Sequence, residues 1–390
     1  MNKKTVFVGL SGGVDSSVSA ALLKEQGFEV VGVFIKTWHP NFIACNEEEE
    51  RRDAMRVAAH LDIPFLTFDF EDVYKKEVGD YMIAEYKAGR TPNPDVMCNQ
   101  HVKFGAFLNK ALSMGADHVA TGHYAQVAFS NQTKPTFSQS LGSSLRSATP
   151  SKKQVLLGCG FDKSKDQSYF LWTLRQEQLS KILFPVGHLE KSEVRKLAKK
   201  FKLPVATKKD SQGICFLGPV DLKKFLKHYI KEKRGDVVNE AGEVIGHHEG
   251  SVFSTLGERH GFTITKKTPN DERYYVVSKD VKKNILVVSN KKQAKDFGAL
   301  LQPSAGTFRP QNPSLVSVLI EKTNWISEVP NQEKKYTAQI RYHGEFLPCK
   351  IVCGSPTSAE VIFEKPTLVA PGQSIVVYDG DVCLGGGVVK

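Results

Sequence analysis

Long apolar runs are missing from this sequence of 390 residues. None approaches the roughly 20 residues that a membrane-spanning helix needs. The apolar run near the start, residues 5–10, is too short for the core of a signal peptide, and no cleavage site follows it. The sequence therefore predicts a cytoplasmic protein that has no membrane partner.

A disulfide framework is also missing. The number of cysteines is odd and their spacing irregular, which is atypical of a secreted, cross-linked domain. Cys349 and Cys353 lack the second cysteine pair or the histidine pair that a zinc site needs, so we expect no metal bound by protein residues alone. Individual thiols can then serve in chemistry. The seven cysteines are Cys45, Cys98, Cys159, Cys215, Cys349, Cys353 and Cys383.

Acidic residues are scarce in the middle third of the chain. Residues 101–235 hold 24 Lys and Arg against 9 Asp and Glu, and residues 191–234 hold 14 against 4. The whole chain has a net charge of +11. Lys and Arg displace counterions from phosphates, so an RNA partner explains this excess. A basic surface that only aids solubility is the alternative.

The hydrophobic pattern predicts an α/β region followed by a β-rich region. A parallel sheet with helices on both faces is expected first, with ligands at the carboxyl ends of its strands. Residues 130–153 resemble a surface loop or hairpin insertion. Expected strands are 5–10, 29–35, 65–70 and 117–121. Expected helices are 16–26, 47–61, 72–86, 102–114, 176–183, 191–202 and 219–231. Short strands follow at 274–277, 285–288, 337–341, 350–353, 361–363, 374–378 and 382–383.

A glycine-rich turn joins the first expected strand to the first expected helix. It reads Ser-Gly-Gly-Val-Asp-Ser from Ser11 to Ser16. Glycines allow a tight turn that points backbone N–H groups at an anion, and the helix N-terminus adds partial positive charge. The turn lacks the Gly-Lys-Ser/Thr ending of a Walker A loop. It therefore predicts a phosphate site of another kind, and an ordinary helix cap is the alternative.

Two cysteines lie in unusual surroundings. Cys98 follows a proline-stiffened loop at the start of an expected helix, where a thiol ionises more easily. Asp95 precedes it by three residues, so one helical turn can bring both to one face. Cys215 follows two lysines and lies between glycines, which also favours a thiolate. Simple packing of either cysteine as a small hydrophobe is the alternative.

Several motifs together resemble the tRNA-specific 2-thiouridylase family of the N-type ATP pyrophosphatase superfamily. They occur in the family's order and span nearly the whole chain: 11–16, 89–98, 120–124, 165–171, 184–187, 210–216 and 383–387. The resemblance implies a Rossmann-like ATP-pyrophosphatase domain with a basic helical part at 1–225, a small central β-rich domain at 226–298 and a C-terminal β-barrel at 299–390. Two departures are Ile35, where the family often has Met, and the 130–153 segment, which matches no motif.

The resemblance also implies the site residues. Cys98 and Cys215 are catalytic, Cys215 carries a persulfide, and the two can close as a disulfide; Asp95 is the general acid or base. ATP contacts fall on Gly9, Leu10, Ser11, Gly12, Gly13, Val14, Asp15, Ser16, Ile35 and Gly122. Asn93, Pro94 and Asp95 line the target base, and further tRNA contacts fall on His123, Lys165, Asp166, Gln167, Arg341, Tyr342 and Gln373.

The implied reaction is ATP-dependent 2-thiolation of the wobble uridine of tRNA. Adenylation of the C2 oxygen makes AMP the leaving group, and Mg²⁺ offsets the phosphate charge. The expected partners are tRNA and a persulfide sulfur donor, either a cysteine desulfurase or a sulfur-relay protein. Three alternatives remain at this point: an amide-forming synthetase on a small molecule, a non-catalytic RNA-binding protein, and a tRNA thiolase that acts on a different nucleotide.

Overall fold

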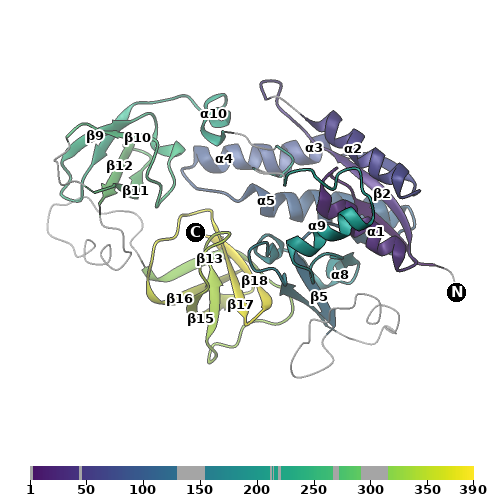
Figure 1. Cartoon of the computed structure of the whole chain (residues 1–390). Coiled ribbons are helices and arrows are strands. Elements are labelled where there is room, and N and C mark those ends of the chain that lie inside the picture. Colours follow the sequence, from purple (N-terminus) through teal and green to yellow (C-terminus); the bar gives the residue numbers. More distant parts are fainter. Residues whose placement is uncertain are drawn as a thin grey trace.

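The structure is a computed structural model that describes residues 3–43, 46–129, 154–210, 213, 215–217, 221–266, 272–290 and 315–390. Three folded parts follow one another along the chain (Figure 1). A parallel sheet with helices comes first, a five-stranded β domain second and a β-barrel third. The expected order of fold classes is therefore confirmed.

The first part is built on a parallel sheet of strand order β3-β2-β1-β4-β7. Successive residues of β1 point to opposite faces. Val6 and Val8 pack in a core with α1, α2 and α9, whereas Phe7 packs on the other face with residues 102–111. The strands are β1 (Thr5–Gly9), β2 (Glu29–Lys36), β3 (Phe65–Asp69), β4 (His118–Ala120) and β7 (Ile182–Leu183).

The helices of this part differ from the expected ones in two places. The single helices predicted over 72–86 and 102–114 each contain a π-helical segment, η1 (Lys75–Asp80) and η2 (Cys98–Phe107). The other helices are α1 (Val14–Glu25), α2 (Glu47–His60), α3 (Glu71–Tyr74), α4 (Tyr81–Lys87), α5 (Pro94–Met97) and α6 (Leu108–Ser113).

The helix predicted over 176–183 was wrong in its second half. Helix α8 covers only Gln176–Leu179, and Ile182 and Leu183 form strand β7 beside β4. A short apolar run fits a buried strand as well as a helix, so its period alone could not decide. The remaining helical elements are η3 (Ser168–Leu171), α9 (Lys191–Lys200) and α10 (Leu222–Lys227).

The central part is a five-stranded sheet of order β10-β9-β8-β12-β11, in which β8 and β12 run parallel and the other pairs antiparallel. Its core contains Val237, Val276 and Leu286. The sequence prediction found β11 and β12 but missed the shorter strands before them. The elements are β8 (Gly235–Val238), β9 (Val244–His248), η4 (Ser251–Phe253), β10 (Phe262–Ile264), β11 (Tyr275–Asp280) and β12 (Ile285–Ser289).

The third part is a six-stranded antiparallel barrel, closed where β13 pairs with both β16 and β18. A hairpin from the first part, β5 (Ala125–Phe129) and β6 (Val155–Cys159), extends its sheet because β6 pairs with β18. The predicted 130–153 insertion lies between these strands, outside the described residues. The barrel strands are β13 (Leu315–Trp325), β14 (Tyr336–Gln339), β15 (Leu347–Ser355), β16 (Ser358–Thr367), β17 (Ser374–Asp379) and β18 (Val382–Val389).

One glycine of the first part allows a turn to approach the start of strand β5 closely. A Cβ atom at Gly187 would lie 1.7 Å from the backbone oxygen of Ala125. We therefore expect Gly187→Ala to lower the free energy of unfolding by about 1–3 kcal/mol, because backbone must move to make room. Urea denaturation followed by circular dichroism measures this.

Gly354→Ala is the matched control, since a Cβ atom there meets only the Ser358 hydroxyl, at 3.9 Å. Its free energy of unfolding should stay within about 0.5 kcal/mol of the parent. Equal stability of the two variants would contradict the proposed crowding at Gly187.

Candidate active site

The glycine-rich turn lies at the carboxyl edge of the sheet, between β1 and α1. Gly12 has a φ of +69°, a conformation that favours glycine. The Ser16 hydroxyl accepts a hydrogen bond from the Ser11 backbone at 3.3 Å, and the Ser17 hydroxyl donates to the Gly13 oxygen at 2.7 Å. No side chain caps the first turn of α1. Backbone N–H groups at this helix start are therefore suited to an anion.

Two further predicted ATP residues lie beside this turn. A Cβ atom at Gly122, which follows β4, would lie 2.6 Å from the Ser16 nitrogen, so only glycine fits there. Ile35 lies near the end of β2 and is 5% exposed. Since β1 pairs with both β2 and β4, the structure brings all the predicted ATP residues to one edge of the sheet.

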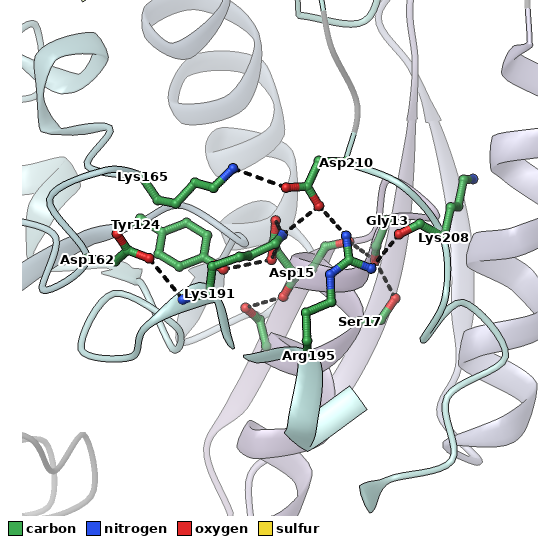
Figure 2. Close-up of polar contacts among 12 residues, drawn as sticks. Gly13, Asp15, Ser17, Tyr124, Asp162, Lys165, Lys191, Arg195, Lys208 and Asp210 are labelled. Carbon is green, nitrogen blue, oxygen red and sulfur yellow. Dashed lines mark hydrogen bonds and ion pairs between the residues drawn. The ribbon is translucent and has the colours of Figure 1, made fainter. Parts of the chain in front are cut away.

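A network of ion pairs connects this turn to a distant part of the chain (Figure 2). The Lys191 ammonium, at the start of α9, donates to both carboxylate oxygens of Asp15 at 2.6 and 2.8 Å. It also lies 2.9 Å from Asp210. The Tyr124 hydroxyl donates to Asp15 at 2.9 Å. One lysine thus joins the phosphate-type loop to the segment that leads to Cys215.

Asp210 is the centre of the second half of this network. Arg195 and Lys165 also pair with its carboxylate, Lys165 at 3.1 Å. Although burial acts in the opposite direction, hydrogen bonds from Lys191 and Lys165 lower the pKa of Asp210 to about 2. Arg195 further donates to the backbone oxygens of Ala206 and Lys208. These contacts fix residues 206–210 against α9.

The two predicted catalytic cysteines lie together, although 117 positions separate them. Cys98 directly follows α5 and is fully buried; Cys215 lies in a turn and is half-buried. The Cys98 thiol donates to the Cys215 sulfur, with 3.4 Å between the two atoms. Both are free thiols in this structure. A shift of the sulfur atoms toward each other would allow a disulfide.

The backbone of Cys215 is held on two sides. Its N–H donates to the Asp95 carboxylate at 2.8 Å, and its carbonyl accepts from the buried Tyr74 hydroxyl at 2.6 Å. His39 contacts the next carbonyl, that of Phe216, at 2.8 Å. Burial raises the pKa of Asp95, and the hydrogen bond from Cys215 opposes this. Asp95 therefore positions the Cys215 turn, a role that the spacing of Asp95 and Cys98 did not indicate.

The two thiols differ in their ease of ionisation. The hydrogen bond from Cys98 lowers the pKa of Cys215. Burial raises the pKa of Cys98 well above its ordinary value. The expectation that a helix start eases ionisation of Cys98 is therefore wrong, because α5 runs on into η2 and encloses the thiol. Of the two thiols, Cys215 is therefore the one that ionises more easily.

The loop before Cys98 lies where the three parts of the protein meet. The Thr91 backbone donates to the Pro371 oxygen of the barrel at 2.7 Å, and its hydroxyl lies 3.2 Å from that of Thr255 in the central part. Gln373 donates to the Thr91 oxygen at 3.1 Å. The Asn93 side chain accepts from the Val96 backbone and so caps α5. Pro94 is the first residue of that helix.

The other predicted tRNA residues divide into exposed and buried ones. Arg341 is exposed, and Tyr342 is half-buried against Phe170, with 4.4 Å between ring centroids. The Lys165 side chain is 40% exposed. The Gln167 side chain accepts from the Tyr124 backbone at 3.1 Å. The structure therefore gathers only some of this group on the surface.

His123 and Asp166, two of the predicted tRNA residues, are buried in this structure. His123 lies between Phe104 and Phe184, and Thr121 bonds its ring nitrogen at 2.7 Å. Asp166 accepts from the backbones of residues 160 and 168. Both are under 9% exposed. Their contact with tRNA stays a prediction.

Sequence reasoning missed the most connected side chains of the site. In the sequence, Lys191 and Arg195 are recognisable only as part of the basic stretch 191–234, and nothing points to a role for Tyr74. Their partners are 176, 15 and 141 positions away respectively. The only local signal was the spacing of Lys191 and Arg195, which places both on one face of α9.

The fold and the site define a nucleotide-using enzyme with a paired-thiol centre. Residues 4–219 match the tRNA methyl transferase HUP domain, 223–290 the tRNA methyl transferase PRC-barrel domain, and 316–389 the aminomethyltransferase beta-barrel domain. No helix among the described residues is long and apolar enough to span a membrane.

Relatives that match over the full length identify the family within this class of enzymes. The chain is 42% identical to the tRNA-specific 2-thiouridylase MnmA of Nitrosomonas eutropha, over 100% of this chain and 99% of that protein. It is 43% identical to the protein of the same name from Bacillus velezensis, over 98% and 94% respectively. The chain belongs to the tRNA-specific 2-thiouridylase family.

The ion-pair network yields a testable prediction. Asp210→Asn leaves Lys191, Arg195 and Lys165 without their shared carboxylate, so residues 206–210 should detach from α9. We expect the free energy of unfolding to fall by about 1 kcal/mol and amide hydrogen exchange in 203–210 to become several-fold faster. Mass-resolved hydrogen exchange on the intact chain measures the second effect.

The control is Asp379→Asn, which breaks the exposed pair with Lys334. A pair of this kind contributes about 0–1 kcal/mol, and exchange in 203–210 should not change. Unaltered exchange in the Asp210 variant would refute an anchoring role for this network.

Proposed function

We propose that this chain replaces the C2 oxygen of the wobble uridine of tRNA with sulfur and cleaves ATP to AMP and pyrophosphate. The observation that carries the proposal is the pair of thiols 3.4 Å apart, together with the ion pairs of Lys191, which join the phosphate-type loop to Asp210. The domain descriptions name methyl transferases, whereas the full-length relatives are named for thiolation. The paired thiols favour thiolation over methyl transfer.

Activation of the base is the first half of the proposed chemistry. A C2 carbonyl oxygen is a poor leaving group, and its adenylation by ATP turns it into AMP. The loop 9–16 would hold the phosphates, with Gly122 and Ile35 beside the nucleotide. Backbone N–H groups of that loop would stabilise the charge that develops on the departing pyrophosphate.

Mg²⁺ fits this site as a companion of ATP. The ion usually binds through one or two carboxylates, several waters and the substrate phosphates. Asp15 offers a carboxylate at the loop, with a side chain 31% exposed. We propose that Asp15 holds the ion, which would supply neutralisation of the phosphate charge. Lys191 and Tyr124 fix the orientation of that carboxylate.

Sulfur transfer is the second half. The terminal sulfur of a persulfide on Cys215 attacks C2, and AMP leaves. Cys98, after losing its proton, then attacks the Cys215 sulfur. The bond between Cys215 and the transferred sulfur breaks, the Cys98–Cys215 bond forms, and the 2-thiouridine is released. If Cys98 attacks first, hydrosulfide is freed and attacks C2 itself. Either order leaves one disulfide, which a thiol reductant must reduce by two electrons.

The RNA partner is proposed from charge and exposure. The basic stretch 191–234, together with Lys165 and Arg341, would contact phosphates, which position the RNA without reading its sequence. Asn93, Pro94 and Asp95 would line the flipped uridine, with Tyr342 and Gln373 on the barrel side. The unstacked anticodon loop makes such flipping cheaper.

A persulfide donor, either a cysteine desulfurase or a sulfur-relay protein, would load Cys215. Free thiols are the state that a reducing cytoplasm maintains, and we place the reaction there. The domain limits we propose remain 1–225, 226–298 and 299–390.

The activity can be tested with the full chain, unmodified tRNA, ATP, Mg²⁺ and a cysteine desulfurase with cysteine. Nucleoside mass analysis should show one sulfur-for-oxygen exchange in uridine, and only with ATP. Cys98→Ser and Cys215→Ser should each lose about 100-fold or more of the rate. Cys353→Ser, on the barrel, should retain it.

The competing reactions give different results. Release of AMP with no sulfur in any tRNA, despite an active donor, would move the assignment to a small-molecule synthetase. No release of AMP or pyrophosphate would favour a binding protein.

The thiol pair can be tested without RNA. A mild oxidant such as diamide should join Cys98 to Cys215 in the parent, and dithiothreitol should reverse this, because the sulfur atoms are already in contact. Peptide mapping identifies the link. Tyr74→Phe frees the Cys215 carbonyl and should slow closure several-fold. A cross-link that forms equally fast in urea would contradict a preformed pair.

A further inference from the structure

The π-helical segment η2 brings one further charged residue to the thiol pair. Lys103 follows Cys98 by five positions in η2 (Cys98–Phe107). In an α-helix, residues three or four apart share a face. In a π-helix the backbone bonds run from i to i+5, so residues five apart lie above one another. The unusual winding therefore places Lys103 on the same face as Cys98.

The ammonium group of Lys103 lies near the sulfur atoms of the thiol pair. Its ammonium lies 5.6 Å from the centre of the Phe216 ring, next to Cys215 in the chain. It interacts with Cys215, by charge and by a side-chain hydrogen bond, and with Cys98. The carboxylate that acts on Lys103 is that of Asp95, which contributes by charge alone and not by a hydrogen bond.

We propose that Lys103 is a further catalytic residue, whose ammonium stabilises the thiolate of Cys215 and so prepares it to accept sulfur. This inference rests on the proposed function, because it assigns Lys103 a part in loading the persulfide. Lys103 belongs to none of the residues that the sequence motifs indicate.

The charged and titratable groups around Cys215 act in opposite directions. The Cys98 hydrogen bond is the largest influence that lowers the pKa of Cys215, and Lys103 acts in the same sense. Burial and the charge of Asp95 raise it. Tyr74 contacts the Cys215 carbonyl through its hydroxyl. Lys103 is the only cation among these groups in the described structure. Without it, burial and Asp95 would still raise the pKa of Cys215, and only the hydrogen bond from Cys98 would lower it.

Lys103 itself stays charged in this position. Burial lowers its pKa, but the two cysteines and Asp95 act together to raise the pKa above the ordinary value of lysine. His123, on the loop after β4, has its pKa lowered well below the ordinary value, mainly by burial, and so adds no second cation. The cation that acts on Cys215 is therefore Lys103, and the nearby His39 ring contacts the Phe216 carbonyl.

The step that benefits is the uptake of sulfur. The Cys215 thiolate attacks the terminal sulfur of a donor persulfide. One S–S bond forms on Cys215, the S–S bond of the donor breaks, and the donor leaves as a thiolate that takes up a proton. No net oxidation occurs. The thiolate is the reactive form of a cysteine, so the fraction of it at neutral pH sets the rate.

The test is the pH dependence of alkylation of Cys215 by iodoacetamide in the reduced full chain. An opposite charge within a few ångströms changes a pKa by about 1–3 units, so Lys103→Met should slow the alkylation of Cys215 at pH 7 by about 10-fold or more. Lys103→Arg keeps the charge and should stay within about threefold of the parent. Peptide mass analysis assigns the modified cysteine.

Lys110→Met is the matched control, because Lys110 lies exposed on α6 of the same helical run. Its Cys215 profile should equal that of the parent. Repeating the series with Cys98→Ala removes the hydrogen bond that also lowers the pKa of Cys215, and the effect of Lys103→Met should then persist. Circular dichroism verifies folding, and Lys103→Gln replaces Lys103→Met if the latter unfolds.

The outcomes are distinct. A Cys215 profile that is the same in Lys103→Met, Lys103→Gln and the parent would overturn the inference. Alkylation needs neither RNA nor ATP, so a chain that fails to thiolate tRNA can still support the role of Lys103 at the thiol. A parent that thiolates tRNA while all Lys103 variants alkylate equally leaves the proposed function intact and removes Lys103 from it.

Discussion

The contact of Lys191 with both Asp15 and Asp210 is the interaction on which the site depends. It spans 176 positions on one side and joins the phosphate-type loop to the segment that carries Cys215. A single ammonium group between two carboxylates is stable only while both remain charged and in place. A ligand that draws Asp15 away from Lys191 therefore also alters the restraint on Asp210. Lys191 thus connects the glycine-rich loop with the segment that precedes Cys215.

A second constraint acts on Cys98, through the loop that precedes it in the chain. The loop 89–93 is fixed by Thr91 to both the barrel and the central sheet, and Asn93 caps the helix that ends at Cys98. The two β-rich parts therefore contribute to the position of a sulfur atom that neither contains. The hairpin β5–β6 of the first part also extends the sheet of the barrel, so the two parts are joined there as well. Through its contacts with Thr91, the barrel helps to hold the loop that precedes Cys98 in place.

The sequence was sufficient for the order of domains and for the loop between β1 and α1, because strand periods and glycine-rich turns are local signals. It was insufficient where a choice depends on distant partners. Ile182 and Leu183 became a strand because β4 lies beside them. His123 and Asp166 belong to a motif, yet the fold buries them. The π-helical winding at Cys98 has no simple sequence pattern, so the alignment with Lys103 could not be foreseen.

The two thiols differ in burial and in their ease of ionisation. Local sequence treats Cys98 and Cys215 alike, since each follows features that ease ionisation. The fold separates them: one is enclosed in a continuous helix, and the other accepts a hydrogen bond from the first and faces a cation. A nucleophile that must accept sulfur from outside needs exposure and negative charge. A partner that acts only after transfer needs to stay protonated and shielded until then. Burial of Cys98 and half-exposure of Cys215 are compatible with these two roles in the proposed reaction.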